Sequence, residues 1–420
     1  MNTTSDLHGR RLLRLSEQLT EILRRTEYTP QESSKVSTKD ILFSLLPNTS
    51  SPHQVNEEES IKNLALACAL LSSSRSSTHE LLSWIPETLS VIGESTFREI
   101  SRDCFSDFPS NAEELVVDSG KIELLPIVLP ELKDGIEKSS LGKSSDTEDV
   151  VAAMARTPVG YAIIAAHQLR WFVTQVEKPD LVKFCNLVVP CALTALDHWS
   201  PEVKGQGIIS LVHLAKNVTS GDLGLYGDVV LDACCQNIAS DDEIWIHVVE
   251  LSVLLVTKLH PNNPRSPWYE KIMNEMLGHL ERQPRNKERR IAWLRFIEPL
   301  LNALGLFLLA HFRRIFPLFF QWMHSDDAET VLLVLERLET VVRLTWIRNS
   351  PFIPRLVEEL VSLYKESSTR KDRDDIRPLI LRILMLLRQC KSLQFESAWS
   401  QYQEDPNLST VSEYIWASSS

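Results

Sequence analysis

The sequence predicts an all-α protein in which antiparallel helix pairs stack into a solenoid. Three observations predict this class. Apolar residues recur at steps of three and four over most of the chain. Gly is scarce, at 13 of 420 residues, which argues against all-β and dinucleotide-binding folds. Stretches that break the helical pattern recur at a nearly constant interval, and one helix pair alone cannot bury both of its faces.

The clearest helix pair lies between Asp180 and Val218. Its first helix places one set of apolar residues on a single face. Ser200 can cap the second helix, and Pro201 suits its first position, where a missing N–H costs nothing. The two apolar sets are Leu181, Phe184, Leu187, Val188, Cys191 and Ala195, then Val203, Ile208, Leu211, Val212 and Ala215.

This pair has the features of a HEAT unit. Those features are a Pro in the first helix, an Asp at the turn, a Val-Lys pair that opens the second helix and a Leu near its end. The matching residues are Pro190, Asp197, Val203, Lys204 and Leu211.

Repetition supports this reading. The turn residues Asp197, Asp241 and Asp326 are separated by 44 and 85 residues (241 − 197 and 326 − 241), and the second interval is close to twice the first. A period of roughly 40–47 residues is typical of HEAT and armadillo arrays. The C-terminal half therefore has room for about five units, which makes the expected fold a HEAT/armadillo-like α-solenoid.

Before the solenoid, the helical segments are short and irregularly spaced. The expected helices are Leu7 to Thr26, Asp40 to Leu46, Ile61 to Leu71, His79 to Ile92 and Lys121 to Ile136, with kinks at Pro126 and Pro130. Glu137 to Asp146 is rich in Ser, Lys and Gly and forms the best domain boundary. We expect an irregular helical region over 1–146, a repeat solenoid over 147–391 and a C-terminal tail over 392–420.

The solenoid pairs follow in order. Thr147 to Val176 holds a small-residue helix and then a long apolar helix from Tyr161. After the pair described above, the expected pairs are Leu225 to Ile238 with Glu243 to Leu259, Ser266 to Leu280 with Lys287 to Leu304, Leu306 to Met323 with Ala328 to Leu344, and Phe352 to Tyr364 with Ile376 to Cys390.

Composition restricts the function. A net charge of −12 and a pI near 5.5 argue against direct nucleic-acid binding as the main role. The seven Cys contain no C-x-x-C pair, so neither a zinc ribbon nor a redox motif is indicated. The longest apolar run, Pro299 to Phe312, is too short to span a bilayer, and the N-terminus lacks a signal-peptide core. We expect a soluble protein with reduced thiols, in the cytoplasm and the nucleus.

No catalytic signature is present, and we expect no enzyme activity, cofactor or metal. Gly205-Gln206-Gly207 lies in a helix without a preceding strand, which favours close helix packing over a dinucleotide loop. Cys234, Cys235 and His247 lack a fourth ligand at a suitable spacing, so core packing is the better interpretation. Asp241 to Glu243 suit helix capping, with partner contact as the alternative.

Two features are candidates for partner binding. Trp199 and Trp268 lie at or near turns and could anchor a partner or cover a helix end. The densest basic run could dock an acidic partner, with a solvated turn as the alternative; its cations are Arg282, Arg285, Lys287, Arg289 and Arg290.

Other aromatic residues have simpler interpretations. The tail motif Tyr414-Ile415-Trp416 could pack back on the solenoid or bind a partner. Five Trp in apolar helical faces are expected in the core: Trp171, Trp245, Trp293, Trp322 and Trp346.

Several strings after Thr147 resemble the Tel-two-interacting protein two family, a subunit family of the triple-T (TTT) co-chaperone complex. They are RTPVGYAIIAAHQLRWFV (156–173), DHWSPEV (197–203), LYGDVVLDA (225–233), LERLETVVRLTW (335–346) and PRLVEELVSLY (354–364). The resemblance covers about Thr147 to Lys391. None of the strings is a catalytic motif, and their order and spacing carry the likeness.

The resemblance implies a non-catalytic α-solenoid scaffold. It implies that the partners are Tel-two and Tel-two-interacting protein one and that the complex acts with Hsp90 and its R2TP adaptor. That complex matures phosphatidylinositol-3-kinase-related kinases. The alternative function is a generic HEAT-repeat adaptor in transport or phosphatase assembly.

Overall fold

The computed structural model describes residues 2–28, 36–46, 57–104, 113–139, 157–239, 242–348 and 351–417. Within these ranges every regular element is a helix, which confirms the all-α class. The chain divides into two compact units, unit 1 from Met1 to Ala233 and unit 2 from Cys234 to Ser420, and helix α11 (Gly227–Asn237) crosses the point of division.

Unit 1 is a set of packed helices in which one central helix, α7, contacts several others. Helix α7 packs against α3, α5 and α9, while α8 packs against α5 and α9. Its elements before α11 are α1 (Asn2–Arg25), α2 (Thr38–Leu45), α3 (Glu57–Ser73), η1 (Ser74–Ser76), α4 (Glu87–Cys104), α5 (Glu113–Glu137), α7 (Val159–Thr174), η2 (Asp180–Phe184), α8 (Cys185–Leu196), α9 (Pro201–Asn217), α10 (Ser220–Leu223) and η3 (Gly224–Tyr226).

Unit 2 continues with α12 (Asp242–Leu259), α13 (Pro267–Arg282), α14 (Lys287–Phe296), α15 (Glu298–Leu304), η4 (Gly305–His311), α16 (Phe312–Met323), α17 (Ala328–Thr345), α18 (Ile353–Glu366), η5 (Ser367–Thr369), α19 (Arg373–Cys390), α20 (Ser392–Trp399), η6 (Ser400–Tyr402), η7 (Pro406–Leu408) and α21 (Ser409–Ala417).

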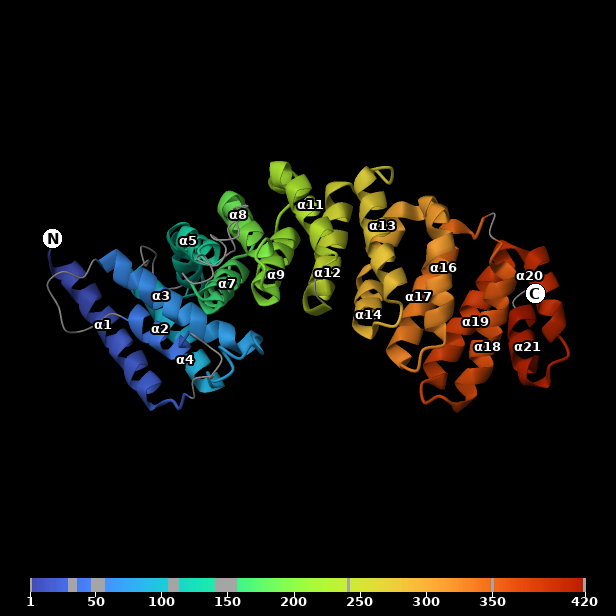
Figure 1. Ribbon diagram of the computed structural model, residues 1–420, viewed down its shortest axis with the longest axis horizontal. Coiled ribbons are helices and arrows are strands. Elements are labelled where there is room, and N and C mark those ends of the chain that lie inside the picture. Colours follow the sequence, from blue (N-terminus) through green and yellow to red (C-terminus); the bar gives the residue numbers. More distant parts are fainter. Residues whose placement is uncertain are drawn as a thin grey trace, which may run out of the picture. The chain divides into compact units, whose positions relative to one another are not determined.

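The helices of unit 2 form two layers (Figure 1). Helices α12, α14, α17 and α19 contact one another in sequence, and so do α13, α16, α18 and α20. Each layer takes one helix from each successive pair, which is the arrangement of a helical-repeat solenoid. This confirms the predicted HEAT/armadillo-like fold.

Local sequence sets several helix starts as expected. Ser200 and Ser266 occupy N-cap positions, and Pro201 and Pro267 follow at the first helical residues. Neither Ser side chain makes a capping hydrogen bond. Pro therefore contributes to these starts mainly through its fixed φ and its absent N–H.

Two expected helices were wrong in their bounds. Residues after His79 form a turn, and α4 begins only after Pro86 and runs through to Cys104. The residue before a Pro is disfavoured in the α region, so Ile85 cannot continue a helix into Pro86. The expected helix from Leu306 is a 3-10 segment until Phe312, because the chain leaves α15 through Gly305 at φ 52°.

Four of the five Trp expected in the core are buried, and Trp346 is the exception with 58% of its surface exposed. Helix α17 ends at Thr345, and both Trp346 and Ile347 adopt positive φ angles. This turn directs Ile347 into the core in place of Trp346. The helical pattern did not predict this because it assumes that α17 continues.

The residues expected as a tail are helical. Helices α20 and α21 bury Phe395, Trp399 and Ile415. The guanidinium of Arg388 donates to the Ile415 carbonyl oxygen at 2.6 Å and lies 4.0 Å from the ring centroid of Trp416. Of the two interpretations of the Tyr414-Ile415-Trp416 motif, the structure shows that it packs against the preceding helices.

Among the residues that the structure describes, one stretch passes the length and composition test for a membrane span. Glu298–Met323 has a mean hydropathy of 1.5 over its most apolar window, and 50% of that window is buried inside the structure. It comprises α15, η4 and α16. A core segment of a folded domain meets the same test, and this stretch supplies core residues such as Phe316, Phe319 and Trp322.

Candidate partner-binding surface

The turns along one edge of unit 2 are joined by hydrogen bonds. Asn286 Nδ2 donates to Asp242 Oδ2 at 3.0 Å. Trp322 Nε1 donates to the Pro284 carbonyl at 2.8 Å, and Arg370 donates to the Ser325 carbonyl at 2.9 Å. These partners lie 44, 38 and 45 residues apart, which is one repeat. The start of α12 and the turns α13–α14, α16–α17 and α18–α19 therefore lie side by side as a turn ladder.

Two of the five predicted docking cations are used inside this ladder. Arg289 is only 5% exposed, pairs with Asp242 and lies 4.9 Å from the Trp245 ring centroid. The Trp245 indole N–H donates to the Arg289 carbonyl at 3.0 Å. The Arg290 side chain is only 12% exposed, pairs with Asp327 and donates to Thr330 Oγ1 at 3.0 Å.

These pairs change the acidity of the ladder carboxylates. The hydrogen bond from Arg289 lowers the pKa of Asp242. Burial opposes the shift at Asp327, but hydrogen bonds from Thr330 and Arg290 still lower its pKa. Asp327 also caps α17 by accepting from the Thr330 N–H at 2.9 Å. Both carboxylates thus stabilise helix starts and join neighbouring repeats.

The other three cations are exposed. Arg282 donates to the Gly278 carbonyl at 2.9 Å. Arg285 and Lys287 make no hydrogen bond or ion pair with the residues that the structure describes. They line a cavity of about 360 Å³ between the α13–α14 and α16–α17 turns, and its other lining residues are Pro284, Arg290, Gln321, Trp322, His324, Ser325, Asp326 and Asp327.

The charge of this cavity is partly balanced. Asp327 is paired with Arg290, and His324 lies 2.9 Å from carboxylate oxygens of both Glu359 and Glu366. Asp326 is exposed and is the one further acidic residue of the lining. Two unpaired cations therefore face one unpaired carboxylate, so an excess positive charge remains for a partner.

The two predicted Trp anchors belong to different units. Trp268 starts α13, about 21 Å along the helix axis from Arg282 at 1.5 Å per residue, and Lys271 lies 4.8 Å from its ring centroid. Trp199 belongs to unit 1, is 52% exposed and stacks on His198, with ring centroids 5.5 Å apart. Within unit 2, Trp268 is therefore distant from the basic turn.

The sequence pattern did not single out the ladder residues His324 and Arg370. Each bonds to a residue 35 to 45 positions away. A search for polar residues recurring at the turn interval could have identified them, because equivalent positions of a repeat become spatial neighbours.

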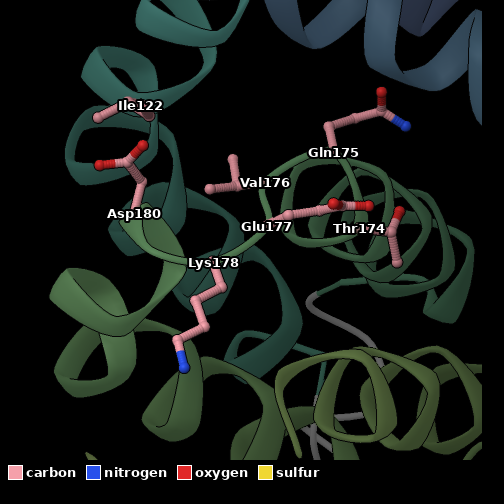
Figure 2. Close-up of a pocket in the computed structure, with 7 residues that line it drawn as sticks. All are labelled: Ile122, Thr174, Gln175, Val176, Glu177, Lys178 and Asp180. Atoms are coloured by element: carbon pink, nitrogen blue, oxygen red, sulfur yellow. The ribbon is translucent and has the colours of Figure 1, made fainter. Parts of the chain in front are cut away.

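Unit 1 contains a cavity of about 400 Å³ beside the end of α7. Figure 2 shows Ile122 and Asp180 on one side, Thr174 and Gln175 on the other, and the Lys178 side chain pointing away from them. Asp180 is already paired with Lys183 at 2.6 Å. The described residues contain no group of three or more His, Cys, Asp or Glu that could hold a metal.

A Ser–His–Glu arrangement in unit 1 does not have the geometry of a catalytic triad. Ser77 Oγ and Glu202 Oε1 both lie beside Nε2 of His167, at 3.5 and 2.7 Å. A triad needs the hydroxyl and the carboxylate on different ring nitrogens, and Nδ1 of His167 has no hydrogen-bond partner. Burial lowers the pKa of His167, while its hydrogen bond lowers the pKa of Glu202.

The described thiols have the properties of core residues. Cys68, Cys185, Cys191, Cys234 and Cys235 are buried. Burial raises the pKa of Cys191 to about 11 and that of Cys234 to about 12. Thiols in this state are poor nucleophiles and poor metal ligands at neutral pH.

Comparisons with known proteins give two relatives. The chain is 87% identical over 425 aligned positions to the Arabidopsis thaliana protein described as "Uncharacterized protein At2g39910", covering 100% of this chain and 97% of that one. It is 26% identical over 210 residues to Homo sapiens "TELO2-interacting protein 2", covering 47% of this chain and 41% of the human protein. No family model matches. The second relative confirms the resemblance found in the sequence.

Among solved structures, the chain is similar to importin beta, with 11% identity and a TM-score of 0.48, over 96% of this chain and 56% of that one. It is also similar to an engineered protein, with 12% identity and a TM-score of 0.47, over 99% and 98% of the two chains.

Proposed function

Because this chain belongs to the family of the Arabidopsis thaliana protein At2g39910, and resembles human TELO2-interacting protein 2 over about half its length, we propose that it is a scaffold subunit of a TTT-type co-chaperone complex. The likeness to the human protein is the observation that carries this proposal. The matched stretch spans less than half of the human protein, so partners and activity remain part of the proposal.

In this proposal the protein binds a Tel-two-like subunit and a subunit like Tel-two-interacting protein one. The assembled complex acts with Hsp90 and R2TP on phosphatidylinositol-3-kinase-related kinases in the cytoplasm and the nucleus. The contribution of this chain is binding rather than chemistry. A solenoid suits such a role because stacked repeats offer a long surface to several partners.

Within unit 2, the proposed docking surface for the partner is the part of the turn ladder with unpaired cations. Arg285 and Lys287 are exposed, lie beside a cavity and are not occupied by internal carboxylates. The whole chain carries a net charge of −12, so an acidic partner is repelled by most of its surface. A local cationic site on an acidic protein directs such a partner to one place and raises its association rate.

The first experiment identifies the partners. The protein is tagged in its native cells, purified under mild conditions and analysed by mass spectrometry. We expect the two other TTT subunits in near-equal amounts. Recovery of importin cargo or a phosphatase catalytic subunit in their place would support the generic adaptor, which is the alternative function.

The second experiment tests the effect on clients. After depletion of the protein, we expect lower steady-state amounts of phosphatidylinositol-3-kinase-related kinases with unchanged transcripts. A kinase of another family serves as the control. Normal amounts of all these kinases after complete loss would contradict the co-chaperone role.

The third experiment tests the docking surface. Changing Arg282, Arg285 and Lys287 to Glu should slow association and weaken binding, with the wild-type complex itself sensitive to salt. The matched control changes three other exposed cations of unit 2 to Glu, Arg313, Arg348 and Arg373, with the same change of net charge. Equal binding by the two variants would leave the basic turn as a solvated surface.

A further inference from the structure

A second cavity in unit 1 lies where the end of α3, α4, α7 and α9 meet. Its volume is about 420 Å³. Seven of its nine lining residues are polar, and they include two arginines and only one carboxylate. The lining residues are Ser72, Arg75, Ser76, Glu94, Arg170, Trp171, Thr174, Gln175 and Ile209.

Arg170 is the unusual residue of this cavity. It is 8% exposed, and its guanidinium donates to the carbonyl oxygens of Ser73 and Ser76 at 3.3 and 3.4 Å and also bonds to Ser76 Oγ. It forms no ion pair with any carboxylate that the structure describes. Its Nε–H makes no hydrogen bond within those residues either.

The other buried arginines of the described residues differ from Arg170 in this respect. Arg289 pairs with Asp242, and Arg337 pairs with Glu298 and Glu336. Removing a guanidinium from water is costly, and buried charges are normally compensated by an opposite charge. Helix-end carbonyls supply only about half an elementary charge. The positive charge of Arg170 is therefore only partly compensated on the side that lines the cavity.

The acidic residues near Arg170 are already engaged. Glu202, whose negative charge acts on Arg170, accepts from His167 at 2.7 Å and from Gln206 at 2.9 Å. Glu94 pairs with Arg98 at 2.6 Å and with Arg75 at 3.4 Å. The contacts of Arg75 with Glu94 and Glu87 are long, at 3.4 and 3.6 Å, and half of its side chain is exposed, so it is free to exchange partners.

We propose that this cavity binds an oxyanion, the phosphate or carboxylate group of a ligand, which Arg170 recognises at its inner wall and Arg75 at its rim. A planar guanidinium is the side chain best suited to such groups, because its parallel N–H donors match two oxygens. Ser72 lines the same cavity, and its buried hydroxyl has no hydrogen-bond partner. This proposal is independent of the co-chaperone role.

The test uses the full chain with two probes, inorganic phosphate and N-acetyl-glutamate amide. Thermal unfolding and calorimetric titration are followed at constant ionic strength, held with NaCl. We expect a saturable rise in the melting temperature with at least one probe, as for any ligand that binds only the folded state. Phosphate alone would indicate a phosphorylated ligand, and the amide alone would indicate an acidic side chain. Absence of saturable binding by both probes would overturn the proposal.

Variants locate the binding. Arg170→Gln should weaken it about tenfold or more, since a charge-assisted contact is lost. Arg75→Gln should weaken it less and should fold normally, because the side chain is half-exposed. Arg348→Gln is the matched control, because Arg348 is an exposed cation of unit 2 that lines neither this cavity nor that of the turn ladder, and it should bind as the wild type does. Unchanged affinity in Arg75→Gln and Arg170→Gln, or in Arg75→Gln alone if Arg170→Gln does not fold, would contradict the assignment.

Discussion

Both units have ion pairs and side-chain bonds to backbone carbonyls, but pairs between an arginine and a carboxylate recur from repeat to repeat in unit 2. In unit 1, side chains bond to backbone carbonyls of other elements, as Gln168 does to Leu66 at 2.9 Å and His213 to Val176 at 2.8 Å. In unit 2, arginines of one repeat pair with carboxylates of another. Examples are Arg314 with Glu281 at 2.7 Å and Arg382 with Glu339 at 3.0 Å.

The difference follows from the regularity of the repeats. When pairs recur at one interval, equivalent side chains stand beside each other, and charge pairs can form between successive repeats. Where the spacing is irregular, as before α8, a buried polar side chain forms its hydrogen bond with a backbone carbonyl that happens to lie nearby. In regular repeats the ion pairs therefore lie at equivalent positions. A cation without an ion pair is easily recognised beside them.

The largest expected effect tests the apolar core of unit 1. Leu211, 2% exposed in α9, should not tolerate Asp, because Leu→Ala alone in a core costs about 2–5 kcal/mol and a buried unpaired carboxylate costs more. We expect loss of the cooperative transition of unit 1 in urea unfolding followed by circular dichroism.

Leu393→Asp is the control for that change, since Leu393 is 82% exposed and should move stability by less than about 0.5 kcal/mol. Limited proteolysis of Leu211→Asp should still leave fragments of unit 2, whose core residues are its own. Simultaneous digestion of both units would show that the division into two units has no meaning for stability.

The next effect concerns the ionic contacts of unit 2. Arg289→Ala removes the bond to Asp242 and the contact with the Trp245 ring. Because the Asp242 side chain is 54% exposed, solvent screens the pair, and we expect a loss of about 1–3 kcal/mol. A double-mutant cycle with Asp242→Asn measures the coupling. A coupling of zero would show that this ion pair between repeats does not stabilise unit 2.

The same pair gives a pH dependence. The folded-state pKa of Asp242 is lowered, chiefly by the Arg289 hydrogen bond. The unfolded state therefore binds the proton more readily, so the stabilisation is complete above the ordinary Asp pKa, near 4, and disappears as the pH falls through the lowered value. The difference in melting temperature between wild type and Asp242→Asn should thus shrink from pH 6 to pH 3. A constant difference would show that the charge of Asp242 contributes nothing.

An effect of similar size comes from a comparison of two glycines in helices. A Cβ on Gly207 would lie 2.8 Å from the Ala192 carbonyl oxygen and from Ala195 Cβ, so Gly207→Ala should force α8 and α9 apart and cost about 1–3 kcal/mol. A Cβ on Gly278 in unit 2 meets only the Arg314 guanidinium at 3.7 Å. Gly278→Ala should stabilise by about 0.5–1 kcal/mol through helix propensity. Thermal melts of both variants measure these changes. A change of stability in the same direction for both variants would contradict this comparison.

The smallest expected change in stability comes from substitutions of exposed cations in the turn ladder. Reversing Arg282, Arg285 and Lys287 to Glu should change the unfolding free energy by no more than about 0.5 kcal/mol, because these side chains are exposed. Chemical denaturation measures this. A larger loss would mean that these cations, like Arg289 and Arg290, belong to the internal ionic contacts of unit 2.

The sequence by itself determined the helical class, the positions of most turns and the interval between them. Local chemistry is sufficient for these, since a 3.6-residue apolar period and a Ser-Pro start act within a few residues. It also distinguished Gly207 as a packing residue, because no strand precedes it.

Only the tertiary structure decided which cations of the basic run are available. In sequence, Arg289 and Arg285 look alike, yet Arg289 is buried against Asp242 and Arg285 has no partner in the described residues. Likewise, only the turn after α17 decided that Ile347 is buried and Trp346 exposed. The physical reason is distance along the chain: each deciding contact comes from a neighbouring repeat or from a change of backbone direction, and a local pattern contains neither.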